Sequence, residues 1–272
     1  MNEKKKRRRV VITGMGMITP LGFTVEETWK NILAGKSGIR PIELFDAETF
    51  PTTFASQVPE FDLGKYCEVT EELKLAGRNV RFALAAARMA YDDAGFAADG
   101  IDAKRFGIYL GSGEGRPDFF SFTASIINGL VGDDASTVDV PGFAKAAFEN
   151  FTALKELQQE PNMPTNHVAH MLGLKGPARS CLTACAASTQ AIGEAMRIVR
   201  RADADIMIAG GTHSMIHPFG VMGFNLLTAI STGPKDDPTK ASRPFDRDRA
   251  GFVLGEGSSM LILEELEHAL AR

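Results

Sequence analysis

Cys185 is the residue of this 272-residue sequence that is best placed to perform chemistry. It stands between an apolar segment and a helix-forming stretch over residues 186–201. A cysteine at such a junction lies at the helix N-terminus, where unpaired backbone N–H groups and the helix dipole favour the thiolate. Ala184, Ala186 and Ala187 leave room for a substrate carbonyl, and the Cys185 N–H can donate to an oxyanion. The pattern indicates a nucleophilic thiol, although the position alone also fits a small buried hydrophobic residue.

Two other kinds of site are not expected near this cysteine. Cys181 precedes Cys185 by four residues but falls in the predicted strand, and further Cys or suitably placed His ligands for a metal are missing. Gly111-Ser112-Gly113 follows a predicted strand but lacks the G-x-G-x-x-G spacing of a dinucleotide site. We therefore expect neither a metal nor a cofactor.

The composition is that of an ordinary globular protein, with 44% hydrophobic and 24% charged residues and a net charge of −4. Residues 1–9 hold six Lys or Arg and one Glu, a charge of +5, so the remaining chain carries −9. An acidic body argues against a nucleic-acid binder. We interpret the basic run as a solvated tail in front of the first strand, rather than as a binding arm.

The sequence also indicates the compartment. No stretch approaches ~18 uninterrupted apolar residues, so no membrane-spanning helix is expected. The apolar run that begins at Val10 is too short for a signal-peptide core, and no cleavage site follows it. Three cysteines cannot form a complete disulfide framework. These features predict a cytoplasmic protein.

Short β-branched runs alternate with longer helical patterns along the chain. Thr24 and Glu27 form a capping-box pattern at the start of the first helix. Strands are predicted over residues 10–13, 106–110, 178–183, 206–211 and 258–263, and helices over 25–34, 78–94, 142–158, 186–201 and from 264 onward. This alternation predicts an α/β fold, a mostly parallel five-stranded sheet with helices on both faces.

Several separated segments carry a resemblance to a known family. They are residues 8–16 (RRVVITGMG), 28–39 (TWKNILAGKSGI), 111–113 (GSG), 173–177 (GLKGP), 183–185 (TAC), 202–211 (ADADIMIAGG) and 242–257 (SRPFDRDRAGFVLGEG). In this order they resemble the β-ketoacyl-[acyl carrier protein] synthases, and the elongating type II enzyme most closely. The resemblance implies that Cys185 is the catalytic nucleophile.

The family has the thiolase fold, in which two similar halves stack into five layers, and this chain resembles the first half. The resemblance therefore implies a basic tail at residues 1–9, a thiolase-like domain at 10–265, and the start of a linker to a second half at 266–272. The sequence ends in a predicted helix without a C-cap, which we interpret as truncation.

The resemblance implies decarboxylative condensation of an acyl group with malonyl-carrier protein in fatty acid elongation, with the acyl group held on Cys185. In the family, the second half supplies two catalytic histidines, a lysine and a second oxyanion N–H. None of these is located in this chain, and no catalytic role is assigned to its five histidines. They are His167, His170, His213, His217 and His268.

Further site residues are implied by their places in the family pattern. Phe252 is expected near the acyl pocket, with core packing as its alternative. Glu114 stands where the family has an apolar residue lining the acyl channel, so it either turns away or adapts the pocket to a short or polar chain. Lys74, Arg78 and Arg81 are expected to steer the acidic carrier protein, with a solvated helix face as the alternative.

Other expectations concern structure and assembly. Arg243 with Asp246, and Arg249 with Glu256, are expected to form structural ion pairs. Residues 114–165 match the family poorly, in a region that contributes to its dimer face and pocket, and the insert-like segment 133–159 is expected to reshape one of the two. The resemblance also implies a homodimer. The alternatives to a fatty-acid ketosynthase are a polyketide-type ketosynthase subunit and a non-catalytic half-domain that dimerises or acts as a scaffold.

Overall fold

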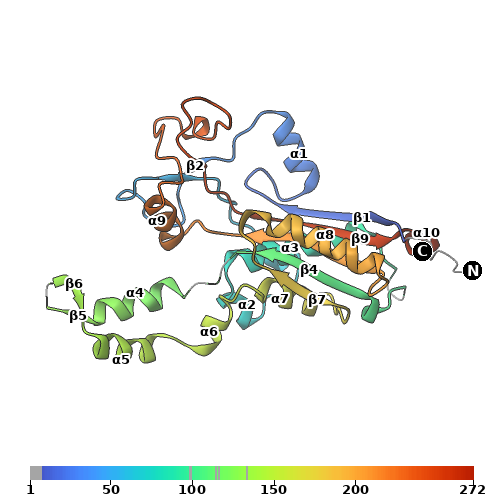
Figure 1. Ribbon diagram of the computed structural model, residues 1–272, viewed down its shortest axis with the longest axis horizontal. Helices are drawn as coiled ribbons and strands as arrows, with labels where there is room; N and C mark the ends of the chain where they lie inside the picture. The colour runs from blue at the N-terminus through green and yellow to red at the C-terminus, as the bar shows by residue number, and fades with distance from the viewer. Residues whose placement is uncertain (1–7, 98–99, 114, 116, 133) are drawn as a thin grey trace, which may run out of the picture.

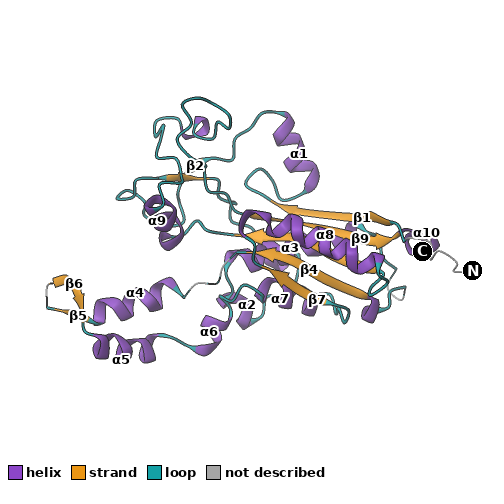
Figure 2. Cartoon of the chain, viewed as in Figure 1, coloured by secondary structure: helices purple, strands orange, loops and turns teal. Residues whose placement is uncertain are grey.

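A central sheet organises the fold (Figures 1 and 2). The computed structural model describes residues 8–97, 100–113, 115, 117–132 and 134–272, with backbone alone for 134–136. Within these residues the sheet has five strands, in the order β1-β9-β8-β4-β7. They are β1 (Val10–Ile18), β4 (Phe106–Ser112), β7 (Ala178–Cys181), β8 (Ile206–His213) and β9 (Gly257–Glu265).

Strand direction agrees with a mostly parallel α/β sheet, with one exception. Strand β4 pairs in parallel with β7 and β8, whereas β9 is antiparallel to both of its neighbours, β1 and β8. Four strands therefore share one direction and β9 opposes them. Residue patterns predicted where the strands lie but not the direction of β9, because burial alternates in the same way along a strand of either direction.

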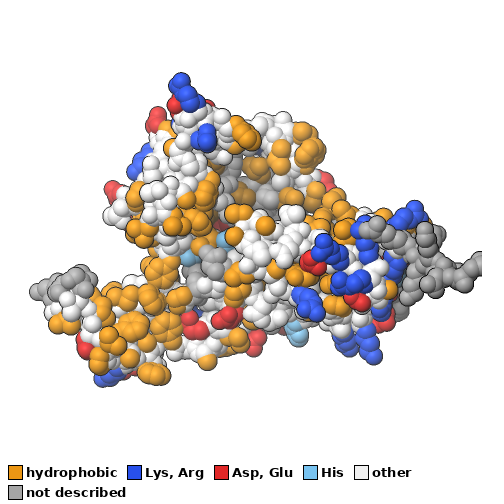
Figure 3. All heavy atoms as spheres, viewed as in Figure 1, with side chains coloured by type: hydrophobic (Ala, Val, Ile, Leu, Met, Phe, Trp, Pro, Cys, Tyr) orange, Lys and Arg blue, Asp and Glu red, His pale blue; other side chains and the backbone are white. Residues whose placement is uncertain are grey.

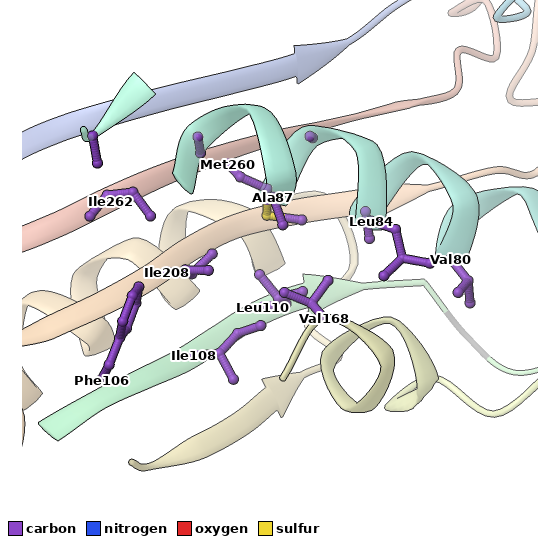
Figure 4. Close-up of a cluster of buried hydrophobic side chains, with 14 of the residues drawn as sticks. Val80, Leu84, Ala87, Phe106, Ile108, Leu110, Val168, Ile208, Met260 and Ile262 are labelled. Carbon is purple, nitrogen blue, oxygen red and sulfur yellow. The ribbon is translucent and has the colours of Figure 1, made fainter. Parts of the chain in front are cut away.

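Helices cover both faces of the sheet, as predicted. Helices α3 (Arg78–Asp93) and α7 (Met163–Met171) pack on one face, and α8 (Ala187–Arg200) packs on the other. Alternate residues of β4 and β8 face α3, as Figure 4 shows for Phe106, Ile108 and Ile208. Met207 and Ala209 of β8 belong to the opposite cluster beneath α8. Because successive side chains of a strand point to opposite faces of the sheet, the strands contribute to two separate hydrophobic cores, one on each face.

The first helix begins as its capping pattern predicts. In α1 (Val25–Leu33) the Glu27 N–H donates to the Thr24 hydroxyl at 3.1 Å, and the Glu27 carboxylate accepts from the Phe23 N–H at 2.9 Å. Two backbone donors at the helix start are satisfied by these side chains.

The prediction of a single helix over residues 142–158 was wrong, because residues 117–159 form several shorter elements. The structure has α4 (Phe119–Asn128), β5 (Leu130–Val131), β6 (Asp134–Val138), α5 (Val140–Asn150) and α6 (Ala153–Leu157). Phe151 is extended and separates α5 from α6. Helix α4 was missed because its Phe, Ser, Thr and Ile residues are not strong helix formers. We call α4 to α6 the arm, since Figure 1 shows this segment extending away from the central sheet.

A smaller lobe lies near the carboxyl ends of the parallel strands. It contains β2 (Arg40–Pro41), β3 (Phe54–Ala55) and α9 (Pro218–Leu226), around a cluster that includes Ala55, Val221 and Leu254. Two further short helices are α2 (Glu71–Leu75) and α10 (Leu266–Ala271). Across the described part of the chain, no helix combines the length and apolar character needed to cross a membrane.

The start of the chain is better anchored than a solvated tail. Arg8, which the sequence places in the basic tail, pairs with the Asp205 carboxylate and donates to the Val199 carbonyl at 3.0 Å. Arg9 forms a more exposed pair with Glu267. The prediction of a solvated tail was therefore wrong for Arg8, which is held against the domain. Residues 1–7 lie outside the described residues.

Candidate active site

Cys185 lies in a 3₁₀ turn, Ala184–Ala186, between β7 and α8. Its side chain is exposed, so it is not the small buried hydrophobic residue that its position alone also allowed. Ala184, immediately before it, has a φ of +49°, in the left-handed region that an alanine rarely adopts. Such local strain persists only where the surrounding structure holds it, and it is frequent at functional sites.

Cys185 opens onto a cavity of about 710 Å³ at the carboxyl ends of β4, β7 and β8. Apolar side chains such as Leu182, Met215 and Leu254 contribute to its wall, together with Phe224. Glycines of β4 and β8, including Gly111 and Gly211, line it as well. A cavity at this edge of an α/β sheet is a common place for a ligand.

The N-terminus of α8 lies directly after the Cys185 turn. Ala187 is the first residue of this 14-residue helix, and in the described structure no side chain caps it at Ala186. The first N–H groups of the helix are therefore directed toward the turn that carries the sulfur. Together with the helix dipole they favour negative charge there.

The other two cysteines have different surroundings. Burial is the main cause that raises the pKa of the Cys67 thiol, with the Arg88 charge acting in the opposite direction. Burial likewise raises the pKa of Cys181, whose thiol donates to the Ala187 carbonyl at 3.3 Å. Both thiols are thereby made less reactive than an exposed thiol.

Phe252 lines the same cavity as Cys185. Its ring packs edge-to-face on Phe224, with 5.5 Å between centroids. Its backbone is fixed on both sides, because Phe252 N donates to Ala229 O and Ser231 N donates to Phe252 O. The ring is about half exposed, which favours a place in the pocket wall over core packing.

Glu114, expected at the acyl channel, lies outside the described residues. Its neighbour Gly113 does line the cavity. A side chain at Gly113 would overlap the ring of His213, which also lines the cavity. His213 is a pocket residue to which we assigned no role from the sequence. Its position at the end of β8 was the available signal.

The three cationic residues expected at a docking surface differ in their exposure and in their partners. Lys74 is 57% exposed and pairs with Glu71, and Arg81 pairs with Glu60 at 2.8 Å. Arg78 turns inward instead. Only 22% of its side chain is exposed, and its Nη2 lies 2.7 Å from a carboxylate oxygen of Glu256.

The prediction of an ion pair between Arg249 and Glu256 was wrong. Arg249 donates to the Asp246 backbone carbonyl at 2.9 Å, while Glu256 is held by Arg78. Within the described ranges, no ion pair joins Arg243 to Asp246 either; the Asp246 N–H donates to the Arg243 carbonyl instead. Opposite charges lie near one another along the loop in the sequence, which suggested local ion pairs. Arg78 is far from Glu256 in the sequence, so residue spacing could not predict that it is the partner of Glu256.

Three of the four remaining histidines have structural partners. His167 contacts Gln158 at 2.6 Å, and burial is the main cause that lowers its pKa. His217 accepts from Gly220 N at the start of α9, and His268 contacts Glu264. In the described part of the chain, no group of three or more His, Cys, Asp or Glu residues could hold a metal ion.

The comparisons with known proteins define the family. Residues 7–269 match the family model for the beta-ketoacyl synthase N-terminal domain, and the chain belongs to this family. It is 39% identical over 269 residues to the 3-oxoacyl-[acyl-carrier-protein] synthase 2 of Coxiella burnetii, a match that covers 98% of this chain and 60% of the relative. The chain thus spans about 60% of the length of the curated relatives that it matches.

Solved structures agree on the fold, which is that of thiolase-like ketosynthases. A beta-ketoacyl synthase from Burkholderia phymatum has a TM-score of 0.79 and 32% identity, covering 97% of this chain and 61% of that chain. A type II polyketide ketosynthase, in complex with its acyl-carrier protein and bound to a hexaketide, has a TM-score of 0.77 and 29% identity, covering 98% and 60%.

Proposed function

We propose that this chain carries the acyl-accepting nucleophile of a 3-oxoacyl-acyl carrier protein synthase, an acyltransferase of fatty acid elongation. The observation that carries the proposal is the place of Cys185, exposed in a largely apolar cavity at the N-terminus of α8. Membership of the ketosynthase family supports the same chemistry.

In the proposed first step the Cys185 thiolate attacks the carbonyl carbon of an acyl thioester on the carrier protein. A new S–C bond forms, the bond to the carrier thiol breaks, and that thiol leaves as a thiolate that takes up a proton. The Cys185 N–H is placed to stabilise the transient oxyanion. Phe252 and the apolar wall of the cavity would contact the acyl chain.

In the proposed second step malonyl-carrier protein loses CO₂, and the electrons of the broken C–C bond form an enolate. The nucleophilic carbon of this enolate attacks the carbonyl carbon of the Cys185 thioester. A C–C bond forms, the C–S bond to Cys185 breaks, and the cysteine thiolate is released. We assign no residue of this chain to the polarisation of the malonyl thioester. Acyl capture is therefore the part of the reaction that we attribute to the described residues.

A polyketide-type ketosynthase is the second candidate, and it is favoured by the likeness to a polyketide ketosynthase bound to a hexaketide. Both candidates use the same nucleophile and differ in the acyl group. Glu114 lies outside the described residues. Because the family has an apolar residue at this position of its acyl channel, we propose that Glu114 bears on that choice, since an unpaired carboxylate is unfavourable beside a long apolar chain.

We propose acyl carrier protein as the partner, with Lys74 and Arg81 at the docking surface. The side chain of Lys74 is 57% exposed and that of Arg81 is 29% exposed, and each is paired with a glutamate. Carrier proteins are acidic, so the two cations would steer the approach. Arg78, which we also expected at this surface, is largely engaged by Glu256 and would contribute little directly.

We further propose a homodimer in the cytoplasm. Figure 3 shows hydrophobic side chains gathered over the arm. In this segment Phe120, Val140 and Phe148 are each more than 70% exposed. Strand β7 ends the sheet with one edge unpaired in the described residues, as a strand at an interface between copies would. A reducing compartment fits the three free cysteines.

Thiol labelling tests the proposed nucleophile. We expect iodoacetamide, or the ketosynthase inhibitor cerulenin, to modify Cys185 ahead of Cys67 and Cys181, because burial raises the pKa of the other two thiols. Peptide mass spectrometry over a time course would measure the three rates. The Cys185→Ser variant is the control, and it should also fail to take an acyl group from acyl-carrier protein. Equal labelling of all three cysteines would sink the proposal.

A further inference from the structure

Glu256 is a fully buried carboxylate in the wall of the Cys185 cavity, and the proposed mechanism does not use it. A buried charge is strongly unfavourable unless donors surround it. The donors that surround Glu256 therefore show which residues hold this part of the cavity wall in place.

Donors from three distant segments converge on this carboxylate. Its Oε1 accepts from Arg78 Nη2 at 2.7 Å and from Val58 N at 2.9 Å. Its Oε2 accepts from Ser214 Oγ at 2.6 Å, and Arg78 Nε lies 3.2 Å from both oxygens. The charge is thus neutralised by Arg78 and saturated by hydrogen bonds.

These contacts join the cavity wall to the framework of the fold. Arg78 is the first residue of α3, and Ser214 directly follows β8. A second tie runs from the Thr212 hydroxyl, in the cavity wall, to the Asn79 carbonyl at 2.6 Å. The N-terminus of α3 is thereby fastened to the cavity wall at Glu256 and Thr212.

The Arg78–Glu256 pair also lies between two cavities. Glu256 lines the larger one with Cys185, whereas Arg78 lines a second cavity of about 420 Å³ together with Arg40, Gln57 and Glu60. The backbone supports the same partition, since Ser56 N donates to Leu254 O and Glu256 N donates to Ser56 O. A short backbone bridge between Ser56 and Gly255 and the Arg78–Glu256 side chains together close the wall at this point.

We propose that Glu256 and Arg78 are positioning residues that hold the turn from Leu254 to Gly257 as one wall of the acyl pocket. This inference rests on the proposed function, because it assumes that the cavity takes an extended acyl chain. The pair does not touch the reacting atoms. It fixes the apolar wall past which a long chain must lie, while a small reagent reaches Cys185 without contacting that wall.

A matched pair of thiol reagents tests this role. N-methylmaleimide and N-dodecylmaleimide carry the same electrophile, so the ratio of their rates at Cys185 reports on the wall rather than on the sulfur. In Glu256→Gln we expect the rate with the dodecyl reagent to fall about tenfold while the rate with the methyl reagent is unchanged. Glutamine keeps the size of the side chain but loses the charge that pairs with Arg78.

Glu264→Gln is the matched control. Glu264 is also completely buried and paired with an arginine, Arg272, but it lies at the far end of β9. This variant should lower the melting temperature and leave the rate ratio unchanged. An unchanged ratio in a folded Glu256→Gln protein, or an equal change in both variants, would overturn the inference.

Ser214→Ala provides a milder second variant, since it removes one donor and leaves Arg78 paired. We expect the rate ratio to fall about threefold. Should Glu256→Gln fail to fold, an unchanged ratio in Ser214→Ala overturns the inference by itself. Failure of the proposed function gives a different result, because Cys185 of the unmodified protein would then not react ahead of Cys67 and Cys181.

Discussion

Ala184 and Cys185 show how one backbone torsion is tied to the proposed chemistry. The left-handed φ of Ala184 forms the tight turn between the end of β7 and the start of α8. This turn leaves the Cys185 side chain exposed in the cavity and close to the first N–H groups of the helix. Strain in one residue thus accompanies the placement of the next at the N-terminus of a helix.

Asp205 provides a test of electrostatics away from the cavity. The Arg105 hydrogen bond, aided by Arg8 and opposed by burial, lowers the pKa of Asp205 from 3.8 to about 2. A folded-state pKa below the unfolded value means that the ionised carboxylate stabilises the folded protein above pH 3.8. This contribution is lost as the pH falls toward about 2.

We therefore expect Asp205→Asn to lower the free energy of unfolding by roughly 2 kcal/mol at neutral pH. The difference from the unmodified protein should shrink below about pH 4 and vanish only below about pH 2, as measured by urea denaturation at several pH values. Asp203→Asn is the control, because the exposed pair of Asp203 with Arg201 contributes little. A difference that does not change with pH would contradict the electrostatic explanation.

Strand β1 and helix α3 approach each other more closely than side chains would allow. A Cβ on Gly16 would lie 2.0 Å from the Ala86 carbonyl oxygen, and one on Gly14 would lie 2.2 Å from that of Ala90. Both obstacles are backbone atoms, which cannot move away as a flexible side chain can. The small residues on both elements, glycines in β1 and alanines in α3, therefore allow the strand and the helix to pack this closely.

We predict that Gly16→Ala lowers the free energy of unfolding by about 1–3 kcal/mol, because α3 must shift away from the sheet. Chemical denaturation would measure the change. The control is Gly223→Ala in α9, where nothing lies within 4 Å of the new Cβ. That variant should be neutral or more stable by up to ~1 kcal/mol, since alanine favours a helix. A neutral Gly16→Ala would disprove the close contact.

The arm accounts for much of the exposed apolar surface of the molecule. Phe148 of α5 is 90% exposed, and an isolated patch of this kind usually marks an interaction site. If the arm contacts a second copy, as we propose, Phe148→Glu should shift the protein toward monomer in sedimentation velocity. Lys145→Glu on the same helix changes charge without removing apolar surface, so it should leave the dimer intact. An unchanged dimer in Phe148→Glu would exclude this part of the arm from the interface.

The sequence by itself determined the elements around Cys185. Small residues between an apolar run and a helical pattern located the turn, and the capping residues Thr24 and Glu27 located the start of α1. These features depend on neighbours within a few residues, and local propensity and periodicity record them. The arm was predicted poorly, because its aromatic and β-branched residues favour no single local structure.

Only the tertiary structure decided which distant residues meet. The direction of β9, the cavity formed from segments such as Pro20, Ser112 and Phe252, and the pairing of Arg78 with Glu256 all join residues far apart in the chain. Charge and spacing suggested Arg249 as the partner of Glu256 because it lies nearby in the sequence. Packing of α3 against the sheet brings Arg78 there instead, since a buried carboxylate must be neutralised by whichever cation the fold places beside it.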